Sequence, residues 1–401
     1  MTDLFWPGDH LAGDLMSDAA FFAAMVAVEQ AWLDCLVEAE IAPPEARAEL
    51  GRLVNESDLE LIARGADADG NPVSGMVAVL RERSAAPTAR WLHRGLTSQD
   101  VVDSALMSCA RDVLVRLTGE FVTQVQAMAQ LAESHRGTPA LARTLTQAAL
   151  PSTLGGKFAR WLVGVLDAAE PLAGLLPTLP AQVGGAVGTL AAATELAGSV
   201  DGAIALGDAL AAALRLAPAP PWHTTRSTVT RLGDVLVSCC DAWGHIAADV
   251  ATMSRPEVGE LAEGTGGGSS TMPHKNNPVR SVLIRRAAIT AGPLGATLHV
   301  AAGASVDERS DGAWHAEWAT LRTLARHTVV AAAHTSELLA GLRVEEARAA
   351  ANLAAADGLL SEQRSMTDLT GRPARSDYTG ATDRLIESTL SRARRFAKEN
   401  S

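Results

Sequence analysis

Residues 98–134 read SQDVVDSALMSCARDVLVRLTGEFVTQVQAMAQLAES, and this stretch decides the fold class. Its apolar residues recur every three or four positions, which places them on one face of an α-helix. They are Val102, Leu106, Ala110, Val113, Leu117, Phe121, Val125 and Met128. At roughly 1.5 Å per residue, this helix is about 55 Å long. A helix of that length buries its apolar stripe only against neighbours of similar length.

The expected neighbours are helices over residues 153–176, 186–214, 227–253, 278–303 and 312–340. Prolines at 218, 220 and 221 break the chain before the third of these, and Gly292-Pro293 is expected to kink the fourth. Shorter helices are expected elsewhere. The sequence therefore predicts an all-α protein. Its parts are a small N-terminal helical domain over 1–94, a central bundle of five long helices over 95–340, and a small C-terminal helical domain over 341–401.

The charge balance limits the partners of the chain. Its formal net charge of −12 argues against nucleic acid or an anionic membrane surface as a general partner. The uncharged span 171–194 contains three prolines and four glycines, so it predicts a helix end and a buried glycine turn instead of a membrane span. The N-terminus has no basic start typical of a signal peptide, so we expect a cytoplasmic protein.

The cysteines and histidines show no metal-binding pattern. Cys35, Cys109, Cys239 and Cys240 include no Cys-x-x-Cys pair and are expected to be buried, reduced thiols. His-Glu-x-x-His is absent as well, so the sequence predicts no metal site.

Residues 264–278, GTGGGSSTMPHKNNP, form an unusual loop among long helices. The glycines permit open and closed states. Ser269 can exchange a proton if a neighbouring charge lowers its pKa, and Lys275 supplies that charge or holds a carboxylate. Asn277 can hydrogen-bond an anion or an enolic oxygen. The alternative is a plain flexible linker, although the Met-Pro-His-Lys-Asn-Asn-Pro ending is foreign to linkers.

Thr97 and Ser98 stand where the long helix begins. Either residue can cap the helix, and the free backbone N–H groups there also attract an anion. His93, four residues earlier, can add a proton donor. Simple capping is the alternative interpretation of this segment.

Two further groups of polar residues lie in apolar surroundings. Arg143, Thr144 and Gln147 can bind a substrate or serve as hydrogen-bonding groups of the core. Arg309 is a second possible carboxylate clamp, and His223 lies in the segment Pro221-Trp-His-Thr-Thr-Arg226 before a helix. Taken alone, the last two segments favour structural over catalytic roles.

These residues resemble the fumarase/aspartase superfamily. Its signature Gly-Ser-x-x-Met-x-x-Lys-x-Asn is complete at Gly268, Ser269, Met272, Lys275 and Asn277. The resemblance covers the whole chain. It implies a homotetramer with a twenty-helix core, active sites built from three subunits, and no cofactor.

Within the superfamily, the chain is most similar to bacterial 3-carboxy-cis,cis-muconate cycloisomerases. The similarity lies in five segments, which are Phe5-Trp-Pro-Gly-Asp, Gly70-Asn-Pro-Val, Thr97-Ser-Gln-Asp-Val-Val-Asp, Pro221-Trp-His-Thr-Thr-Arg and Gly312-Ala-Trp-His-Ala-Glu-Trp. Adenylosuccinate lyases carry an Arg-His-Asp type sequence where this chain has Gly70-Asn-Pro. The resemblance implies a lactone-forming reaction on a small tricarboxylate in protocatechuate catabolism.

The resemblance also implies roles for the polar residues. Ser269 transfers the proton and Lys275 is the second catalytic residue. The implied substrate contacts are Asn71, His93, Thr97, Ser98, Arg143, Thr144, Gln147, His223, Asn277 and Arg309.

One residue departs from the superfamily pattern. Many members have His directly after Arg-Thr, where this chain has Leu145. A donor that protonates a leaving amine or hydroxyl is therefore missing at that position. A carboxylate leaving group needs no such donor, because its conjugate acid has a pKa of about 4. Leu145 favours the cycloisomerase over a fumarate-releasing lyase of the adenylosuccinate lyase type. A tetramer without catalytic activity is a third possibility, against which the intact Ser269 and Lys275 argue.

Overall fold

The computed structural model describes residues 3–264, 267–268, 272 and 275–400. The chain divides into two compact units, each assembled from three segments. The first unit comprises Met1–Arg116, Ala173–Leu236 and Gly292–Val329. The second comprises Leu117–Leu172, Val237–Ala291 and Val330–Ser401. The predicted boundaries at 94/95 and 340/341 fall between helices in both cases.

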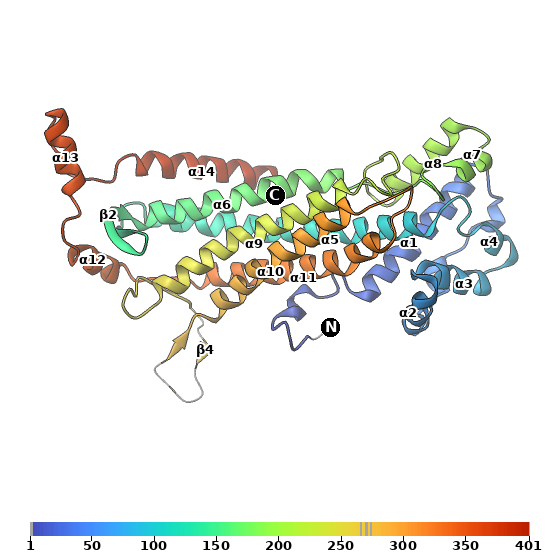
Figure 1. Cartoon of the computed structure of the whole chain (residues 1–401), viewed down its shortest axis with the longest axis horizontal. Helices are drawn as coiled ribbons and strands as arrows, with labels where there is room; N and C mark the ends of the chain where they lie inside the picture. The colour runs from blue at the N-terminus through green and yellow to red at the C-terminus, as the bar shows by residue number, and fades with distance from the viewer. Residues whose placement is uncertain (1–2, 265–266, 269–271, 273–274, 401) are drawn as a thin grey trace. The chain divides into compact units, whose positions relative to one another are not determined.

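Five long helices dominate the described part of the chain, which confirms the all-α prediction (Figure 1). They are α5 (Ser98–Ser134), α6 (Leu154–Leu175), α9 (Ser227–Met253), α10 (Val279–Gly303) and α11 (Gly312–Ala340). The apolar stripe predicted for the first of them is buried from Val102 to Met128. The periodicity of the sequence therefore located these helices to within a residue or two.

The core of the second unit joins three of these helices. The ring of Phe121 on α5 stacks on Trp243 of α9 with centroids 5.1 Å apart. Trp243 Nε1 donates to Gln124 Oε1 at 2.8 Å, and Gln124 Nε2 donates to the carbonyl of Ala332 on α11 at 3.0 Å. A buried glutamine thus satisfies polar groups on both of its neighbours, as burial of polar atoms requires.

A buried charge cluster holds the first unit. Arg226, just before α9, forms ion pairs with Asp103 of α5 at 2.7 Å and with Glu317 of α11. Trp314 Nε1 also donates to Asp103 at 3.0 Å. Burial raises the pKa of Glu317 above the ordinary value of a glutamate. The cluster fixes the start of α9 against the two helices on which it packs in this unit.

Smaller helices complete the first unit. They are α1 (Asp18–Glu38), α2 (Asp58–Asp69), α3 (Val73–Arg83), α4 (Ala86–Trp91), α7 (Ala191–Ala197), α8 (Val200–Ala213) and the short 3-10 helices Asp9–Ala12, Pro44–Ala46, Leu50–Arg52 and Leu176–Thr178. Among the described residues, α1 alone has the length and hydropathy of a possible membrane span, and half of its most apolar window is buried in the protein.

The prediction of one helix over 186–214 is wrong. The chain turns through Gly185 and Gly188, which have positive φ, and then forms α7 and α8 at an angle of 104°. Gly198 ends α7 in the left-handed conformation (φ 70°), and Ser199 caps α8 by accepting from the N–H of Gly202. The expected glycine turn before this region is confirmed, since residues 179–185 are buried.

Within the described residues, the second unit contains three short antiparallel strand pairs, none of which the sequence analysis predicted. Strands β1 (Pro139–Thr144) and β2 (Gln147–Thr153) form a hairpin with Thr144 opposite Gln147. Its two turn residues, Leu145 and Thr146, have φ values of 48° and 72°. Such turns usually carry Asn or Gly, so the sequence offered no turn signal. The other pairs are β3 (Leu261–Ala262) with β6 (Arg343–Val344), and β4 (Gly267–Gly268) with β5 (Asn276–Asn277).

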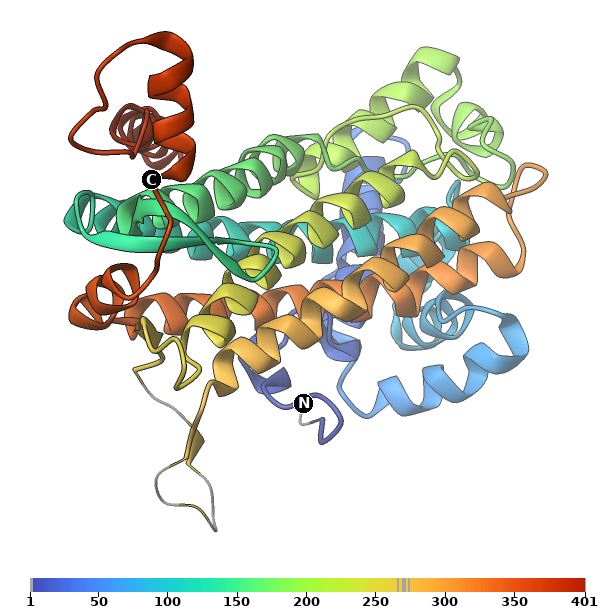
Figure 2. The ribbon, with the colours of Figure 1, turned by 60° about the vertical axis from the view of Figure 1, so that its left-hand side comes forward.

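Three C-terminal helices belong to the second unit: α12 (Glu346–Ala354), α13 (Ser361–Thr370) and α14 (Thr382–Glu399). Helix α12 lies next to strand β1 of the hairpin (Figure 2). Glu346 at the start of this helix lies 2.9 Å from His135. Helix α14 lies alongside α6 (Figure 1), and it buries Ile386, Leu390 and Phe396. Arg392 of α14 reaches Asp167 and Glu170 of α6 at 2.6 and 2.7 Å.

All four cysteines are buried and free, as predicted. Burial raises the pKa of Cys35 to about 11 and that of Cys109 to about 12, and it also raises the pKa of Cys239. The thiols therefore stay protonated at neutral pH.

Candidate active site

Two short paired strands in the second unit flank the central residues of the signature motif. Gly267 and Gly268 of β4 pair with Asn277 and Asn276 of β5. Asn277 Nδ2 also donates to the carbonyl of Gly267 at 3.2 Å. A Cβ on Gly267 would collide with the side chain of Val279, so this glycine allows β4 to lie close to the first residue of α10. Ser269 and His274 lie outside the described residues.

Lys275 stands at the base of the loop. Its backbone N–H donates to the carbonyl of Met272 at 3.0 Å, and its side chain is exposed. Within the described ranges, its ammonium group forms no hydrogen bond or ion pair. Lys275 is therefore a cation that an anionic ligand can engage.

Glu263 anchors the loop to helix α10. This buried carboxylate accepts from the backbone N–H groups of Arg280 and Ser281 at 3.0 and 2.7 Å, and from the Ser281 hydroxyl at 2.6 Å. An acidic group at a helix N-terminus satisfies N–H groups that lack partners within the helix. The sequence interpretation missed Glu263, although its place just before the loop and the next helix is a signal for such a cap.

The β1–β2 hairpin presents the third predicted group of polar residues, also in the second unit. Arg143 binds the buried Glu260 through two hydrogen bonds of 3.1 and 2.7 Å. Asn352 of α12 donates to the same carboxylate at 2.8 Å. In this structure, the guanidinium of Arg143 thus faces a protein carboxylate, and Glu260 is a partner that the sequence did not reveal.

The hairpin tip is exposed. Thr144 and Gln147 flank the turn, and Gln147 Nε2 donates to the hydroxyl of Thr146 at 3.2 Å. The side chain of Leu145 is 95% exposed. No residue from 144 to 147 carries a group that titrates near neutral pH.

In the first unit, Thr97 and Arg309 lie together at the start of α5. The backbone N–H of Thr97 donates to Asp100 Oδ2 at 3.0 Å, and the Thr97 hydroxyl accepts from Arg309 Nη2. Arg309 Nη2 also donates to the carbonyl of Ala186 at 3.2 Å. Ser98 is the first residue of the helix. A guanidinium beside a helix N-terminus is a favourable place for a carboxylate, because both attract negative charge.

Asp100 organises this end of the first unit. Its fully buried carboxylate accepts from the N–H groups of Gly184 and Gly185 at 2.9 Å each, and from Gln182 Nε2 at 3.2 Å. His223 Nε2 lies 3.0 Å from Asp100 Oδ1. The sequence indicated Asp100 only as part of a segment, since its partners lie more than eighty residues further along the chain.

His223 is buried and closely packed. A Cβ added to Gly184 would come within 2.6 Å of its ring, so the glycine leaves room for the imidazole. Nε2 faces Asp100, while Nδ1 is buried without a hydrogen-bond partner. Asp100 and His223 together hold the turn 182–188, whose Ala186 carbonyl contacts Arg309.

His93 and Asn71 occupy other places in the first unit. His93 has a positive φ of 59°, and its Nδ1 lies 2.6 Å from the buried Glu29. Asn71 caps α3, because its Oδ1 accepts from the N–H of Val73 at 3.0 Å. His315 Nε2 contacts the carbonyl of Gly70 at 2.8 Å.

The predicted residues therefore fall into separate groups. The first unit joins Thr97 with Arg309, and His223 with Asp100, whereas Arg143, Lys275 and Asn277 belong to the second unit. Each unit carries a cation in a setting that suits a carboxylate. The fold defines an all-α protein built around long packed helices.

Known proteins share this organisation. A family model described as "Lyase" matches residues 24–291. A nitrosuccinate lyase of Streptomyces davaonensis is 41% identical over 88% of this chain and 77% of its own length. A 3-carboxy-cis,cis-muconate cycloisomerase of Pseudomonas aeruginosa is 37% identical over 93% of this chain and 80% of its own.

A solved structure agrees with these matches. The crystal structure of a 3-carboxy-cis,cis-muconate lactonizing enzyme from Pseudomonas putida has a TM-score of 0.83 at 27% identity, covering 96% of this chain and 97% of that one. The chain belongs to this lyase family, within the fumarase/aspartase superfamily. It is accordingly an enzyme of the lyase and isomerase kind.

Proposed function

We propose that the chain is a cofactor-independent cycloisomerase that interconverts 3-carboxy-cis,cis-muconate and 4-carboxymuconolactone. The observation that carries the proposal is Leu145. It occupies the hairpin turn where many superfamily members have a histidine, and the hairpin tip offers no proton donor. We therefore expect a reaction whose leaving group departs as a stable anion in one direction and adds as that anion in the other.

The lactonisation meets this requirement. In the forward direction, a substrate carboxylate oxygen forms a bond to an alkene carbon, and the alkene electron pair moves toward the neighbouring carboxylate. The resulting enediolate-like anion then takes one proton on its α-carbon. In reverse, the carbon–oxygen bond breaks and the carboxylate leaves unprotonated, because its conjugate acid has a pKa of about 4. One acid–base group suffices, and Ser269 is our choice for it.

Stabilising the anionic intermediate is the main energetic task. Fixed cations and N–H donors lower the free energy of such a charge most effectively when they are in place before reaction. We assign carboxylate binding to two groups of residues. One is Lys275 with Asn277, and the other is Arg309 with Thr97 and Ser98. His93, His223, Asn71, Arg143, Thr144 and Gln147 stay predicted substrate contacts.

A second reaction is favoured by a different observation. The relative from Streptomyces davaonensis, at 41% identity, is named for nitrosuccinate. Elimination from nitrosuccinate would break a carbon–nitrogen bond, pass a proton from the neighbouring carbon to Ser269, and release fumarate and nitrite. Nitrite is, like a carboxylate, the anion of a moderately strong acid, so it too departs without a proton donor. Leu145 is compatible with both reactions.

One experiment separates these functions. The purified chain is mixed with each substrate, and we follow loss of the conjugated diene absorbance of carboxymuconate and appearance of nitrite from nitrosuccinate. We expect the diene to disappear, and Ser269→Ala to slow the reaction by about a hundredfold or more. Nitrite release without lactonisation would establish the second function. Fumarate formed from a succinyl-amine adduct, with neither other reaction, would contradict the role given to Leu145.

A further inference from the structure

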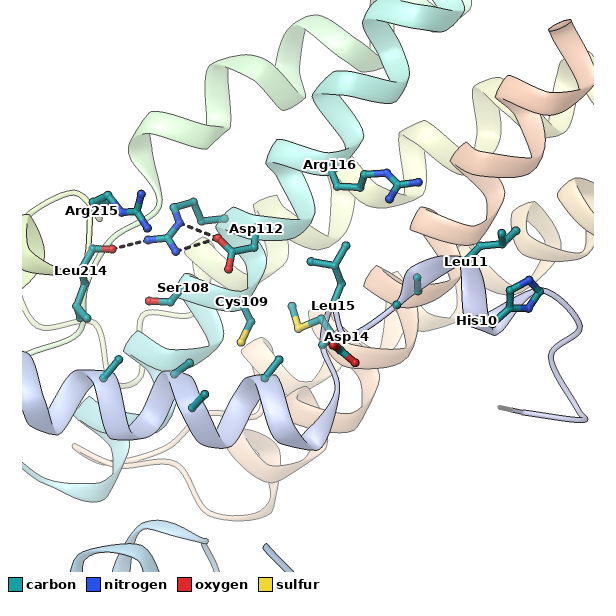
Figure 3. Close-up of a pocket in the computed structure, with 18 of the residues that line it drawn as sticks. His10, Leu11, Asp14, Leu15, Ser108, Cys109, Asp112, Arg116, Leu214 and Arg215 are labelled. Atoms are coloured by element: carbon teal, nitrogen blue, oxygen red, sulfur yellow. Dashed lines mark hydrogen bonds and ion pairs between the residues drawn. The ribbon is translucent and has the colours of Figure 1, made fainter. Parts of the chain in front are cut away.

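A cavity of about 830 Å³ lies in the first unit, away from the predicted substrate contacts (Figure 3). Its walls are the N-terminal segment from His10 to Met16, helix α1, helix α5 from Ser108 to Arg116, and the turn from Ala213 to Arg215. None of the predicted active-site residues lines it. Its chemistry therefore has to be judged separately from that of the proposed reaction.

One wall of the cavity is a smooth apolar surface. Helix α1 contributes Ala20, Ala23, Ala24 and Ala27, whose spacing places them on a single face. Leu11 and Leu15 of the N-terminal segment line the cavity as well. Since the α1 residues carry only methyl groups, they leave open volume beside an apolar wall. Moving a hydrocarbon group from water onto this surface would lower the free energy.

A buried polar atom in the opposite wall lacks a partner. Ser108 of α5 is 8% exposed, and its hydroxyl is buried without a hydrogen bond. Figure 3 shows Ser108 on the part of α5 that lines the cavity, near Leu214. Buried hydroxyls are nearly always hydrogen-bonded, because losing water without replacement is unfavourable. A ligand with an oxygen atom would supply the missing partner.

The rim of the cavity is cationic. Arg111, Arg116 and Arg215 line it, against the two carboxylates of Asp14 and Asp112. Arg111 is engaged, because it donates to Asp112 at 2.8 Å and to the carbonyl of Leu214 at 2.5 Å. The hydrogen bond from Arg111 to the Leu214 carbonyl holds the turn that contains Arg215. The Arg215 side chain is exposed and forms no hydrogen bond or ion pair with any residue that the structure describes.

Cys109 completes the wall as an unreactive group. Its thiol is buried and protonated at neutral pH, as described above, so it is a poor nucleophile. Covalent capture of a ligand is therefore not part of the function of this cavity.

We propose that the cavity binds a small apolar monocarboxylate. The hydrocarbon body lies on the alanine face of α1, a carboxylate oxygen accepts from Ser108, and Arg215 neutralises the charge. This ligand class differs from the polycarboxylate of the proposed reaction, which has little apolar surface to bury. The inference stands independently of which reaction the enzyme catalyses.

Calorimetric titration with octanoate and with 1-octanol tests the proposal, because the two probes share a hydrocarbon chain and differ in charge. We expect octanoate to bind in a saturable manner, about tenfold or more tighter than octanol. Arg215→Gln should remove this preference for the carboxylate. Arg64→Gln, on the exposed face of α2 and outside the cavity, should leave it intact.

A second pair of variants tests the apolar wall. Ala23→Leu projects a larger side chain into the cavity from an exposed helix position that tolerates leucine, so both probes should lose measurable binding. Ala63→Leu on α2 is the matched control and should bind both probes like the parent. Absence of saturable octanoate binding by the parent would overturn the proposal. Equal affinity for the two probes, or unchanged binding by Ala23→Leu, would overturn it too.

Discussion

At the residue scale, Asp100 shows how a single buried carboxylate organises the surroundings of Thr97 and Arg309. It is fully buried, yet four donors besides His223 satisfy it: three backbone N–H groups and the amide of Gln182. These bonds tie the start of α5 to the turn 182–188. The Arg309 guanidinium is held between the two, on Thr97 and Ala186.

Replacing Asp100 with Asn should destabilise the protein by about 3 kcal/mol. The asparagine amide has no negative charge. Its NH2 group would also face the N–H groups that now donate to the carboxylate, so it would have no acceptor there. Urea denaturation at a fixed protein concentration measures this loss. Asp67→Asn, at an exposed position of α2, should stay within about 0.5 kcal/mol of the parent. An Asp100→Asn protein as stable as the parent would show that the buried network contributes little.

At the element scale, helix α14 shows what holds a terminal helix in place. It buries four apolar side chains and Thr389, and ion pairs of two arginines tie it to neighbouring segments. Arg136 binds Asp383 and Glu387 near its start, whereas Arg392 binds Asp167 and Glu170 near its end. The hydrogen bond from Arg392 lowers the pKa of Glu170 below the ordinary value of a glutamate.

The pair formed by Arg392 and Glu170 should make stability depend on pH. A carboxyl with a lowered pKa in the folded state stabilises the protein above its unfolded-state pKa, and this stabilisation is lost as the pH falls through the folded-state value. Arg392→Gln should thus cost about 0.5–1 kcal/mol at pH 7, a modest value because the pair is partly exposed.

The difference between parent and Arg392→Gln should shrink as the pH falls below about 4.3, the ordinary pKa of a glutamate. Urea midpoints across an acidic series of buffers provide the measurement. Arg160→Gln is the control and should show no such trend, because Arg160 is exposed on α6 and forms no ion pair with any residue that the structure describes. A pH-independent difference would mean that Arg392 acts through packing alone.

Elements with strong local signals were predictable from the sequence, whereas contacts between distant segments were not. The range predicted for α9 matches the observed helix residue for residue, because an apolar stripe lies between clear boundaries. Gly198 and Ser199 are a helix-stop and a helix-start signal that the prediction of one helix overlooked, whereas the turn at Leu145 had no such signal. For the candidate site, the signature motif indicates Lys275 and Asn277, whose roles stay predictions. The contact of His223 with Asp100 joins residues 123 positions apart, a pairing that only the fold establishes.

At the scale of the whole molecule, association of several chains is the main untested prediction. Helix α10 exposes Val282 and Ile289, which are seven residues apart on one face and 55% and 70% exposed. Apolar side chains repeated on one helix face commonly mark a surface that another chain covers. In the homotetramer that the superfamily resemblance implies, we expect a second chain to cover the face of α10 that carries Val282 and Ile289.

Sedimentation analysis should find the parent at about four times the chain mass of 41.7 kDa. Ile289→Glu should shift the protein toward smaller species, because it buries a charge at the contact. Leu61→Glu makes the same change in charge at a 62% exposed position of α2, and we expect it to leave assembly unchanged. If active sites are shared between chains, activity should fall with dissociation. A parent that is monomeric and fully active would contradict this prediction.

The turn at Leu145 has an evolutionary consequence. Leucine is strained at a positive φ, which histidine tolerates better, and its exposed side chain contributes nothing to the core of the chain. Leucine and histidine codons can differ by a single base. One point mutation would therefore install an acid–base group on a hairpin already built to carry it. A descendant of this enzyme could thus act on substrates with more basic leaving groups. The single substitution would keep the protein folded, because the side chain at this position is exposed.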